Sequence, residues 1–155
     1  MKRHVLSLLV VILLLAGCSN MAISDEDGQE IERYIRQEVM SPNFGGEIFT
    51  AYEILASNKE KDEIYLWALI MEYYKEGADV EQGSGMSVPM VLKVDRSEGA
   101  FKVTGHTLPR DGSFYADDIK DMFPYFAELK ALDYPSNHIK KLIAEVETQV
   151  AEKLN

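Results

Sequence analysis

Residues 63–76, EIYLWALIMEYYKE, form the longest apolar stretch outside the N-terminus and contain Trp67, the only tryptophan of the chain. In an extended conformation this stretch would present two mostly apolar faces, as expected for a strand that is covered on both sides. One face would carry Tyr65, Trp67, Leu69, Met71 and Tyr73, and the other Ile64, Leu66, Ala68, Ile70 and Glu72. The stretch therefore predicts a central strand.

The same stretch also has the length of a helix, with Asp62 as a cap before it and Gly77 as a stop after it. Two features favour the strand. Aromatic and β-branched side chains suit a pleated surface. In addition, the polar link 59–62 would join the stretch to residues 47–57 as a hairpin, because that preceding segment also alternates like a strand.

Composition places the chain among globular proteins of one domain. It has 155 residues, of which 46% are hydrophobic and 27% are charged. The formal net charge is −10, and loss of Lys2 and Arg3 with residues 1–17 would leave 14 basic against 26 acidic residues, or −12. This excess of acid argues against nucleic acid as a partner and against attraction to anionic lipid headgroups. It is compatible with a cationic partner, or with solubility alone.

The first residues predict an export signal. Lys2 and Arg3 supply positive charge, and residues 5–16 are apolar except for Ser7. This apolar run is shorter than the roughly 20 residues that a spanning helix needs, and it fits the hydrophobic region of a signal peptide.

The sequence Leu15-Ala16-Gly17-Cys18 that follows resembles the lipobox of bacterial lipoproteins at all four positions. The resemblance implies cleavage before Cys18, a diacylglyceryl thioether on its sulfur, and an acylated (for example palmitoylated) N-terminus. The alternative is an ordinary secretory signal with an incidental cysteine. Cys18 is the only cysteine of the chain and lies where the motif requires it, so we favour the lipoprotein.

The predicted organisation is a signal peptide at 1–17, a lipidated tether at 18–24 and one extracytoplasmic α+β domain at 25–155. Two or three acyl chains would anchor the protein stably to the cell membrane, on its outer face. Because no other cysteine exists, the domain must be held together by its core without disulfides.

A helix is predicted at residues 25–40. Acidic residues crowd its start, where they complement the helix dipole, and Asp27 and Glu30 have the spacing of a capping box. Ser41-Pro42 ends it. The apolar stripe of this helix consists of Ile31, Tyr34, Ile35 and Val39.

Strands are predicted at 47–57, 63–76, 87–95 and 100–107, with a polar loop at 77–85 and a turn at 96–99. Pro89 cannot donate a ladder hydrogen bond, so it predicts an edge or a bulge at that point.

From Leu108 onward we predict a turn at 109–112, a short helix at 113–122, an irregular stretch between Pro124 and Pro135, and a final helix at 136–154 that packs on the sheet. The predicted fold is thus α+β: an N-terminal helix, a four-stranded antiparallel meander and C-terminal helices. This order is similar to that of cystatin-like rolls.

Motifs for catalysis are missing: HExxH, GxSxG, SxxK, the P-loop and GxGxxG do not occur. Ser84, His106 and Asp111 could be combined into a triad, but such a triad is recognised by geometry rather than by occurrence. His106 and His138, the two histidines after the signal peptide, would need carboxylates from the fold to hold zinc. We therefore predict no catalytic residue, no metal and no cofactor, and keep a hydrolase using the trio as an alternative.

Three further groups have a functional and a structural interpretation. Residues 111–113 could offer backbone N–H groups to an anion, or form a turn and N-cap. Asp117, Asp118 and Asp121 could share a cation, or form a solvated helix face. The aromatic residues could form a ligand or partner surface, or belong to the core; those proposed for the surface are Tyr65, Trp67, Tyr73, Tyr74 and Tyr115.

Three stretches together carry a resemblance: IYLWALIMEYYKEG at 64–77, GSGMSVPMVL at 83–92 and LPRDGSFYADDIKDMFP at 108–124. They are similar to a domain of small uncharacterised lipoproteins of Bacillus-like bacteria. They are also similar to extracellular segments of the membrane metalloproteases of β-lactam-sensing antirepressor systems. The likeness covers residues 47–124 and implies an accessory or sensory module, with no catalytic residue carried over. The chain lacks the zinc motif of those proteases.

The sequence thus leads to one main hypothesis: a lipid-anchored, non-catalytic binding or sensing module of the cell envelope, with a protein or envelope partner. The alternatives are a cell-envelope hydrolase that uses His106, Asp111 and Ser84, and a purely structural lipoprotein.

Overall fold

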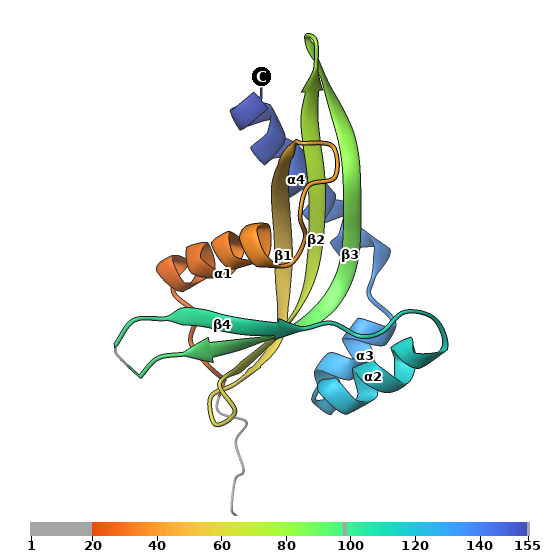
Figure 1. The fold of residues 1–155 in the computed structure, drawn as a ribbon. Helices are drawn as coiled ribbons and strands as arrows, with labels where there is room; N and C mark the ends of the chain where they lie inside the picture. Colours follow the sequence, from red (N-terminus) through yellow and green to blue (C-terminus); the bar gives the residue numbers. More distant parts are fainter. Residues whose placement is uncertain (1–19, 98, 155) are drawn as a thin grey trace, which may run out of the picture.

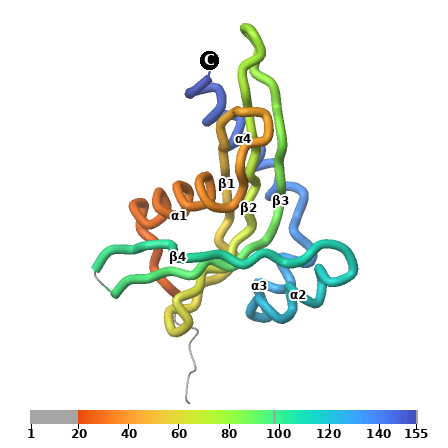
Figure 2. The backbone as a smooth tube through the Cα atoms, viewed as in Figure 1, coloured from red at the N-terminus to blue at the C-terminus, as the bar shows by residue number. Residues whose placement is uncertain are grey.

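The computed structural model describes residues 20–97 and 99–154, so the predicted signal peptide, the lipobox and Cys18 lie outside the described residues. Figures 1 and 2 show the course of the chain. In order, the elements are α1 (Asp25–Glu38), β1 (Glu47–Asn58), β2 (Glu63–Glu76), β3 (Asp79–Asp95), β4 (Lys102–Thr107), the 3-10 turn η1 (Gly112–Phe114), α2 (Tyr115–Met122), α3 (Tyr125–Leu132) and α4 (Ser136–Leu154).

The four strands form one antiparallel sheet in the order β1-β2-β3-β4, which confirms the predicted meander and α+β fold. The predicted central strand is β2, which pairs with β1 along one side and β3 along the other. β4 pairs with β3 only from Val91 onward, so β3 is an edge strand at Pro89, as that proline predicted.

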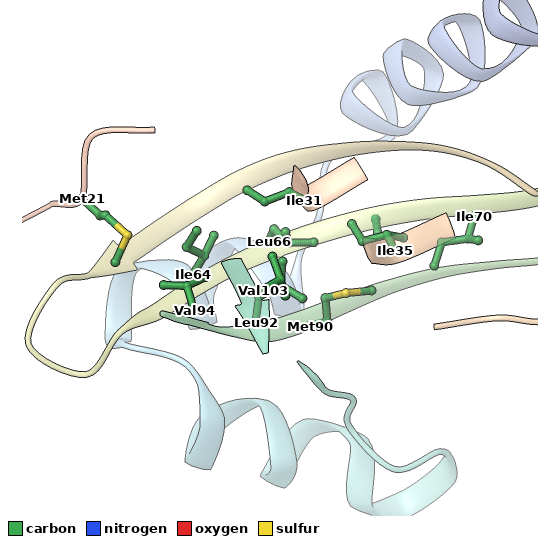
Figure 3. Close-up of a cluster of buried hydrophobic side chains, with 11 residues drawn as sticks. Met21, Ile31, Ile35, Ile64, Leu66, Ile70, Met90, Leu92, Val94 and Val103 are labelled. Atoms are coloured by element: carbon green, nitrogen blue, oxygen red, sulfur yellow. The ribbon is translucent and has the colours of Figure 1, made fainter. Parts of the chain in front are cut away.

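One face of the sheet is covered by α1. Ile31 and Ile35 of this helix are fully buried against the even-numbered side chains of β2 and their neighbours in β3 and β4. Figure 3 shows these side chains gathered between the helix and the sheet. The apolar stripe of α1 therefore meets the face of β2 that carries Ile64, Leu66, Ala68 and Ile70.

The other face is covered by two groups of helices. Leu142, Val146 and Val150 of α4 pack on Trp67 and Leu69, together with Phe49 and Ala51 of β1. Farther along the sheet, α2 and α3 pack on Tyr65 and Val91. Helices on both faces explain why β2 is apolar on both of its sides.

The predicted loop at 77–85 is wrong. The chain reverses tightly at Gly77, whose φ of 68° suits glycine, and β3 starts at Asp79 opposite Glu76. The hairpin arm of β2 and β3 extends past the helices (Figure 1), and much of its β3 half is exposed. Polar residues suit both faces there, so the segment lacks the alternation that marks a half-buried strand.

The predicted irregular stretch between Pro124 and Pro135 is also wrong, because it contains helix α3. Pro124 is the N-cap residue, a position that needs no helical N–H, so it starts the helix instead of preventing one. The buried residues of α3 are the small Ala127 and Ala131, which do not make a visible apolar stripe.

The start of α1 differs in detail from the prediction. The capping box is formed by Ser24 and Asp27: the Ser24 hydroxyl accepts from the Asp27 N–H at 3.2 Å, and the Asp27 carboxylate accepts from the Ser24 N–H at 3.0 Å. Glu30 instead pairs with Arg33 at 2.7 Å.

Across residues 20–97 and 99–154, every helix is too short or too polar to span a membrane.

Candidate functional site

The five aromatic residues predicted to share a surface do not lie together. Tyr65 and Trp67 are buried, with 2% and 9% of their surface exposed, and Tyr115 packs in the same α2–α3 cluster as Tyr65. Tyr73 packs beside α4, whereas Tyr74 stacks on Phe44 at 5.5 Å on the opposite side of the strand. Since helices cover both faces of β2, its aromatic side chains serve mainly as core, and the predicted common surface is not formed.

A polar cluster fixes the junction between α3 and α4. Glu53 of β1 accepts hydrogen bonds from the Tyr134 hydroxyl and from Nδ1 of His138, each at 2.6 Å. The Tyr134 ring stacks on Trp67, with 4.3 Å between centroids and 1° between planes, and the Trp67 indole donates to Ser87 at 2.9 Å. These contacts hold the start of α4 against the sheet.

Burial raises the pKa of Glu53, but the hydrogen bonds from Tyr134 and His138, with the nearby charges of His138 and Lys130, outweigh it and lower the pKa overall. The pKa of Tyr134 is raised by burial and by the Glu53 carboxylate that it faces. The cluster thus stabilises an ionised Glu53 beside neutral Tyr134. The sequence did not reveal it, because Glu53 lies more than 80 residues from Tyr134 and His138.

The structure does not assemble the alternative triad. The Ser84 hydroxyl donates to Glu72 at 2.7 Å, while Nδ1 of His106 lies 3.0 Å from the Tyr34 hydroxyl. His106 belongs to the end of the sheet that holds Ile64, because each of these residues lies opposite Leu92. Glu72 is eight residues farther along β2, or roughly 26 Å of strand. Ser84 and His106 therefore lie at opposite ends of the sheet.

A second buried polar cluster surrounds Glu72. Its carboxylate is fully buried and accepts from the backbone N–H groups of Asn43, Phe44 and Gly46 at 2.7–3.0 Å, as well as from Ser84. Burial raises the pKa of Glu72, but these hydrogen bonds outweigh it and lower the pKa to about 2. Glu72 thereby ties the segment after α1 to the β2–β3 arm.

The acidic residues of α2 are not arranged as a cation site. Asp118 accepts hydrogen bonds from the Arg110 side chain and backbone, which lower its pKa to about 2. In the part of the chain that the structure describes, no group of three or more metal-binding side chains could hold an ion. Asp111 precedes η1 in a turn, with no side-chain capping hydrogen bond.

Helix α3 exposes its large apolar side chains. Phe126 and Tyr125 have 79% and 64% of their surface exposed, although the small Ala127 and Ala131 on the same helix are buried. This is the reverse of the usual orientation for a helix on a sheet. We call the exposed side the α3 apolar face; it consists of Tyr125, Phe126, Leu129 and Leu132.

A groove of about 570 Å³ lies between α1, the start of β1 and the end of α4. Its charged walls contain three basic and two acidic residues, although the whole chain has a formal net charge of −10. Arg36 bridges Glu32 at 2.5 Å and Gln149 at 2.6 Å, and Lys153 pairs with Glu47. We call it the α1–α4 groove; it is lined by Gln29, Glu32, Arg33, Arg36, Gln37, Pro42, Glu47, Ile48 and Lys153.

The described chain joins the folded domain almost at once. Met21 is buried beside Ile64 and Val94, and its backbone N–H donates to the Ser57 hydroxyl at 2.7 Å. Residues 21–24 thus belong to the domain, although the sequence predicted a tether extending through residue 24.

No family model, no curated protein and no solved structure matches this chain. The α1–α4 groove and the α3 apolar face are therefore interpreted from their geometry alone.

Proposed function

We propose that this protein is a lipid-anchored extracytoplasmic lipoprotein that acts as a non-catalytic binding module, with the α1–α4 groove as its ligand site. The observation that carries the proposal is the position of the groove relative to the entry of the chain. Met21 is fixed at Ser57, near the end of β1, whereas the groove contains Glu47 and Ile48 at the start of the same strand. The two points are separated by roughly 30 Å of strand.

This separation suits a module anchored through Cys18. The lipid would hold the Ser57 end of β1 at the membrane, and the α1–α4 groove would open at the other end. Figure 1 shows the β1–β2 turn at the bottom of the view, and the start of β1 with the end of α4 in its upper half. A ligand or partner from the envelope could then reach the groove without approaching the lipid.

The charges of the groove point to the class of ligand. Arg33 and Lys153 have about half of their side-chain surface exposed, so a ligand carboxylate can reach them and compete with their present partners Glu30 and Glu47. Guanidinium and ammonium groups bind carboxylates through charge-assisted hydrogen bonds. The carboxylates of Glu32 and Glu47 could form ion pairs with an amine of the same ligand. We therefore propose a ligand with a free carboxylate, such as the peptide stem of a cell-wall fragment.

The contacts of the two histidines argue against the alternative of a hydrolase. His106 contacts Tyr34 of α1, and His138 contacts Glu53 of β1. Each of these contacts joins a strand to a helix. A histidine used in this way has a structural role that explains its position without catalysis.

Anchoring is tested on the protein from a bacterial host. Mass spectrometry of the mature N-terminus should find Cys18 as the first residue, with a diacylglyceryl group on its sulfur. The Cys18→Ala variant should be left unprocessed and carry no lipid. An unmodified Cys18, or a different cleavage site in the wild type, would contradict the anchor.

Binding is tested by thermal shift with a wall stem peptide that has a free carboxyl terminus. At about 100 times the dissociation constant, the ligand should stabilise the protein by roughly 2.7 kcal/mol, which raises Tm by several degrees. Lys153→Ala should reduce the shift. Lys140→Ala, at an exposed position of the same helix outside the groove, should not.

The amidated form of the same peptide serves as the ligand control, because it lacks the carboxylate. Equal rises in Tm with both peptides would show that the α1–α4 groove does not recognise the carboxylate. The same conclusion would follow if Lys153→Ala and Lys140→Ala reduced the rise in Tm equally. Without any shift for a panel of carboxylate ligands, the groove would not be the site.

A further inference from the structure

We infer that the α3 apolar face rests in the headgroup region of the same membrane that holds Cys18, as a second contact that sets the orientation of the domain. This inference rests on the anchor in the proposed function. It goes beyond the anchor, because a lipid on Cys18 does not by itself require that the α3 apolar face contacts the membrane.

The first step concerns where α3 lies. Ala127 and Ala131 of α3 pack in one cluster with Leu55 and Ala56 of β1 and with Tyr65 of β2. These strand residues form the end of the β1–β2 hairpin, where Ala56 pairs with Tyr65. In Figure 1, α2 and α3 lie in the lower half of the view, as does the β1–β2 turn.

The second step concerns where the chain enters. Met21 contacts Ser57, one position from Ala56, and packs with Ile64, one position from Tyr65. Adjacent residues of a strand point to opposite faces. Met21 and helix α3 therefore lie at the same end of the hairpin, on the two faces of the sheet.

The third step concerns the length of the tether. Only three residue steps separate Cys18 from Met21, and they span at most about 11 Å even when fully extended. A lipid on Cys18 would hold this end of the hairpin against the bilayer surface. The helix on the other face of the same two strands is then brought to that surface as well.

The fourth step concerns the chemistry of the α3 apolar face. Tyr and Phe side chains are favoured at the boundary between headgroups and acyl chains, and leucines enter the apolar side of that boundary. The acidic net charge of the protein rules out electrostatic attraction as the main force. The contact is therefore driven by the burial of apolar surface.

Four side chains on an eight-residue helix form a small contact, which binds weakly when the domain is free in solution. The anchor changes this, because it converts the contact into an intramolecular step with a high effective concentration. We accordingly expect membrane contact by α3 in the lipidated protein, and no measurable vesicle binding when the lipid is absent.

The test places a tryptophan on the face and another far from it. Phe126→Trp reports on the α3 apolar face. Phe44→Trp is the matched control, since Phe44 is 61% exposed and its N–H bonds to Glu72, roughly 26 Å of strand from Ile64. Both variants retain the buried Trp67, whose signal is measured in the parent protein and subtracted. Melting curves confirm that both variants fold.

Each full-length chain is expressed and processed in bacteria and then reconstituted into phosphatidylethanolamine–phosphatidylglycerol vesicles with brominated acyl chains. After flotation, the added tryptophan of Phe126→Trp should be quenched at least about threefold more than that of Phe44→Trp, because only the former reaches the acyl boundary. Its emission should also shift to shorter wavelength.

Three other outcomes would overturn the inference. Equal and weak quenching in floated protein would show that α3 does not touch the bilayer, while leaving the anchor intact. A blue shift at Phe126→Trp without quenching by bromine would assign the face to a protein occupant, such as a second copy. Protein that fails to float would contradict the anchor itself, and with it the contact.

Discussion

The hydroxyl of Ser84 donates a hydrogen bond to the buried carboxylate of Glu72 across 2.7 Å. Glu72 lies where the β2–β3 register shifts, between Met71 and Tyr73, and Ser84 belongs to the opposite strand. The same carboxylate accepts from three backbone N–H groups of the segment before β1. One side chain therefore ties the link between α1 and β1 to the β2–β3 arm, and this link lies between Pro42 and Glu47, which line the α1–α4 groove.

Glu72→Gln should destabilise the protein. The glutamine amide brings an NH₂ group toward N–H donors, so at least one buried donor loses its acceptor. We expect Tm to fall by about 10 °C in thermal denaturation followed by circular dichroism. Glu76→Gln, at an exposed position of the same strand, should leave Tm nearly unchanged. Equal effects of the two substitutions would contradict the role assigned to Glu72.

Stability should depend on pH through the same carboxylate. The pKa of Glu72 is about 2 in the folded protein, below its ordinary value of 4.5. A lowered pKa means that the unfolded state binds the proton more tightly, so the stabilisation is fully present above pH 4.5 and is lost as the pH falls toward 2. The difference in Tm between the wild type and Glu72→Gln should therefore shrink across this window. If the difference in Tm stays constant from pH 7 to pH 2, the lowered pKa of Glu72 is contradicted.

Tyr134 should protect Trp67 from solvent. Tyr134→Ala removes the stacked ring and should shift the Trp67 emission to longer wavelength, with a loss of about 2–3 kcal/mol in the free energy of unfolding. Tyr134→Phe keeps the ring and loses only the hydrogen bond to Glu53, so it should cost about 1 kcal/mol and leave the emission unchanged. A red shift in both variants would show that the hydroxyl, rather than the ring, holds the junction.

Gly46 should not tolerate a side chain. A Cβ atom at this position would lie 2.3 Å from the carbonyl oxygen and 2.8 Å from the carbonyl carbon of Tyr73, so the backbone itself would have to move to admit it. We expect Gly46→Ala to destabilise the protein by about 2–4 kcal/mol in chemical denaturation. Gly105→Ala is the matched control, since nothing lies within 4 Å of its Cβ position, and it should be close to neutral. Comparable losses in the two variants would contradict this account.

Much of the fold was predicted from the sequence because its elements follow simple periodicities. The alternation in residues 63–76 predicted β2, which the structure confirms as a central strand with both faces covered. The apolar stripe containing Ile31 and Ile35 predicted helix α1, which the structure shows packed on β2. Where the pattern was missing, the prediction was wrong. The β3 half of the outer β2–β3 arm is largely exposed, and α3 turns alanines inward and aromatics outward.

The candidate sites were less accessible to sequence reasoning. The α1–α4 groove combines residues from the two ends of the domain, such as Arg33 and Lys153, which no local pattern connects. Both buried carboxylate clusters also depend on distant partners. In the sequence Glu53 looks like any polar residue of a strand, because its partners Tyr134 and His138 are identified only by the structure.

The sequence by itself determined the α+β class, the order of the strands and the two apolar faces of β2, because short-range alternation decides which side chains are buried. It also predicted the lipid anchor at Cys18, which lies outside the described residues. Only the tertiary structure decided that Met21 docks beside Ser57 and that α3 leaves its aromatic residues exposed at the same end of the hairpin. These relationships depend on contacts between residues far apart in the chain, which are set by packing across the whole sheet rather than by any local periodicity.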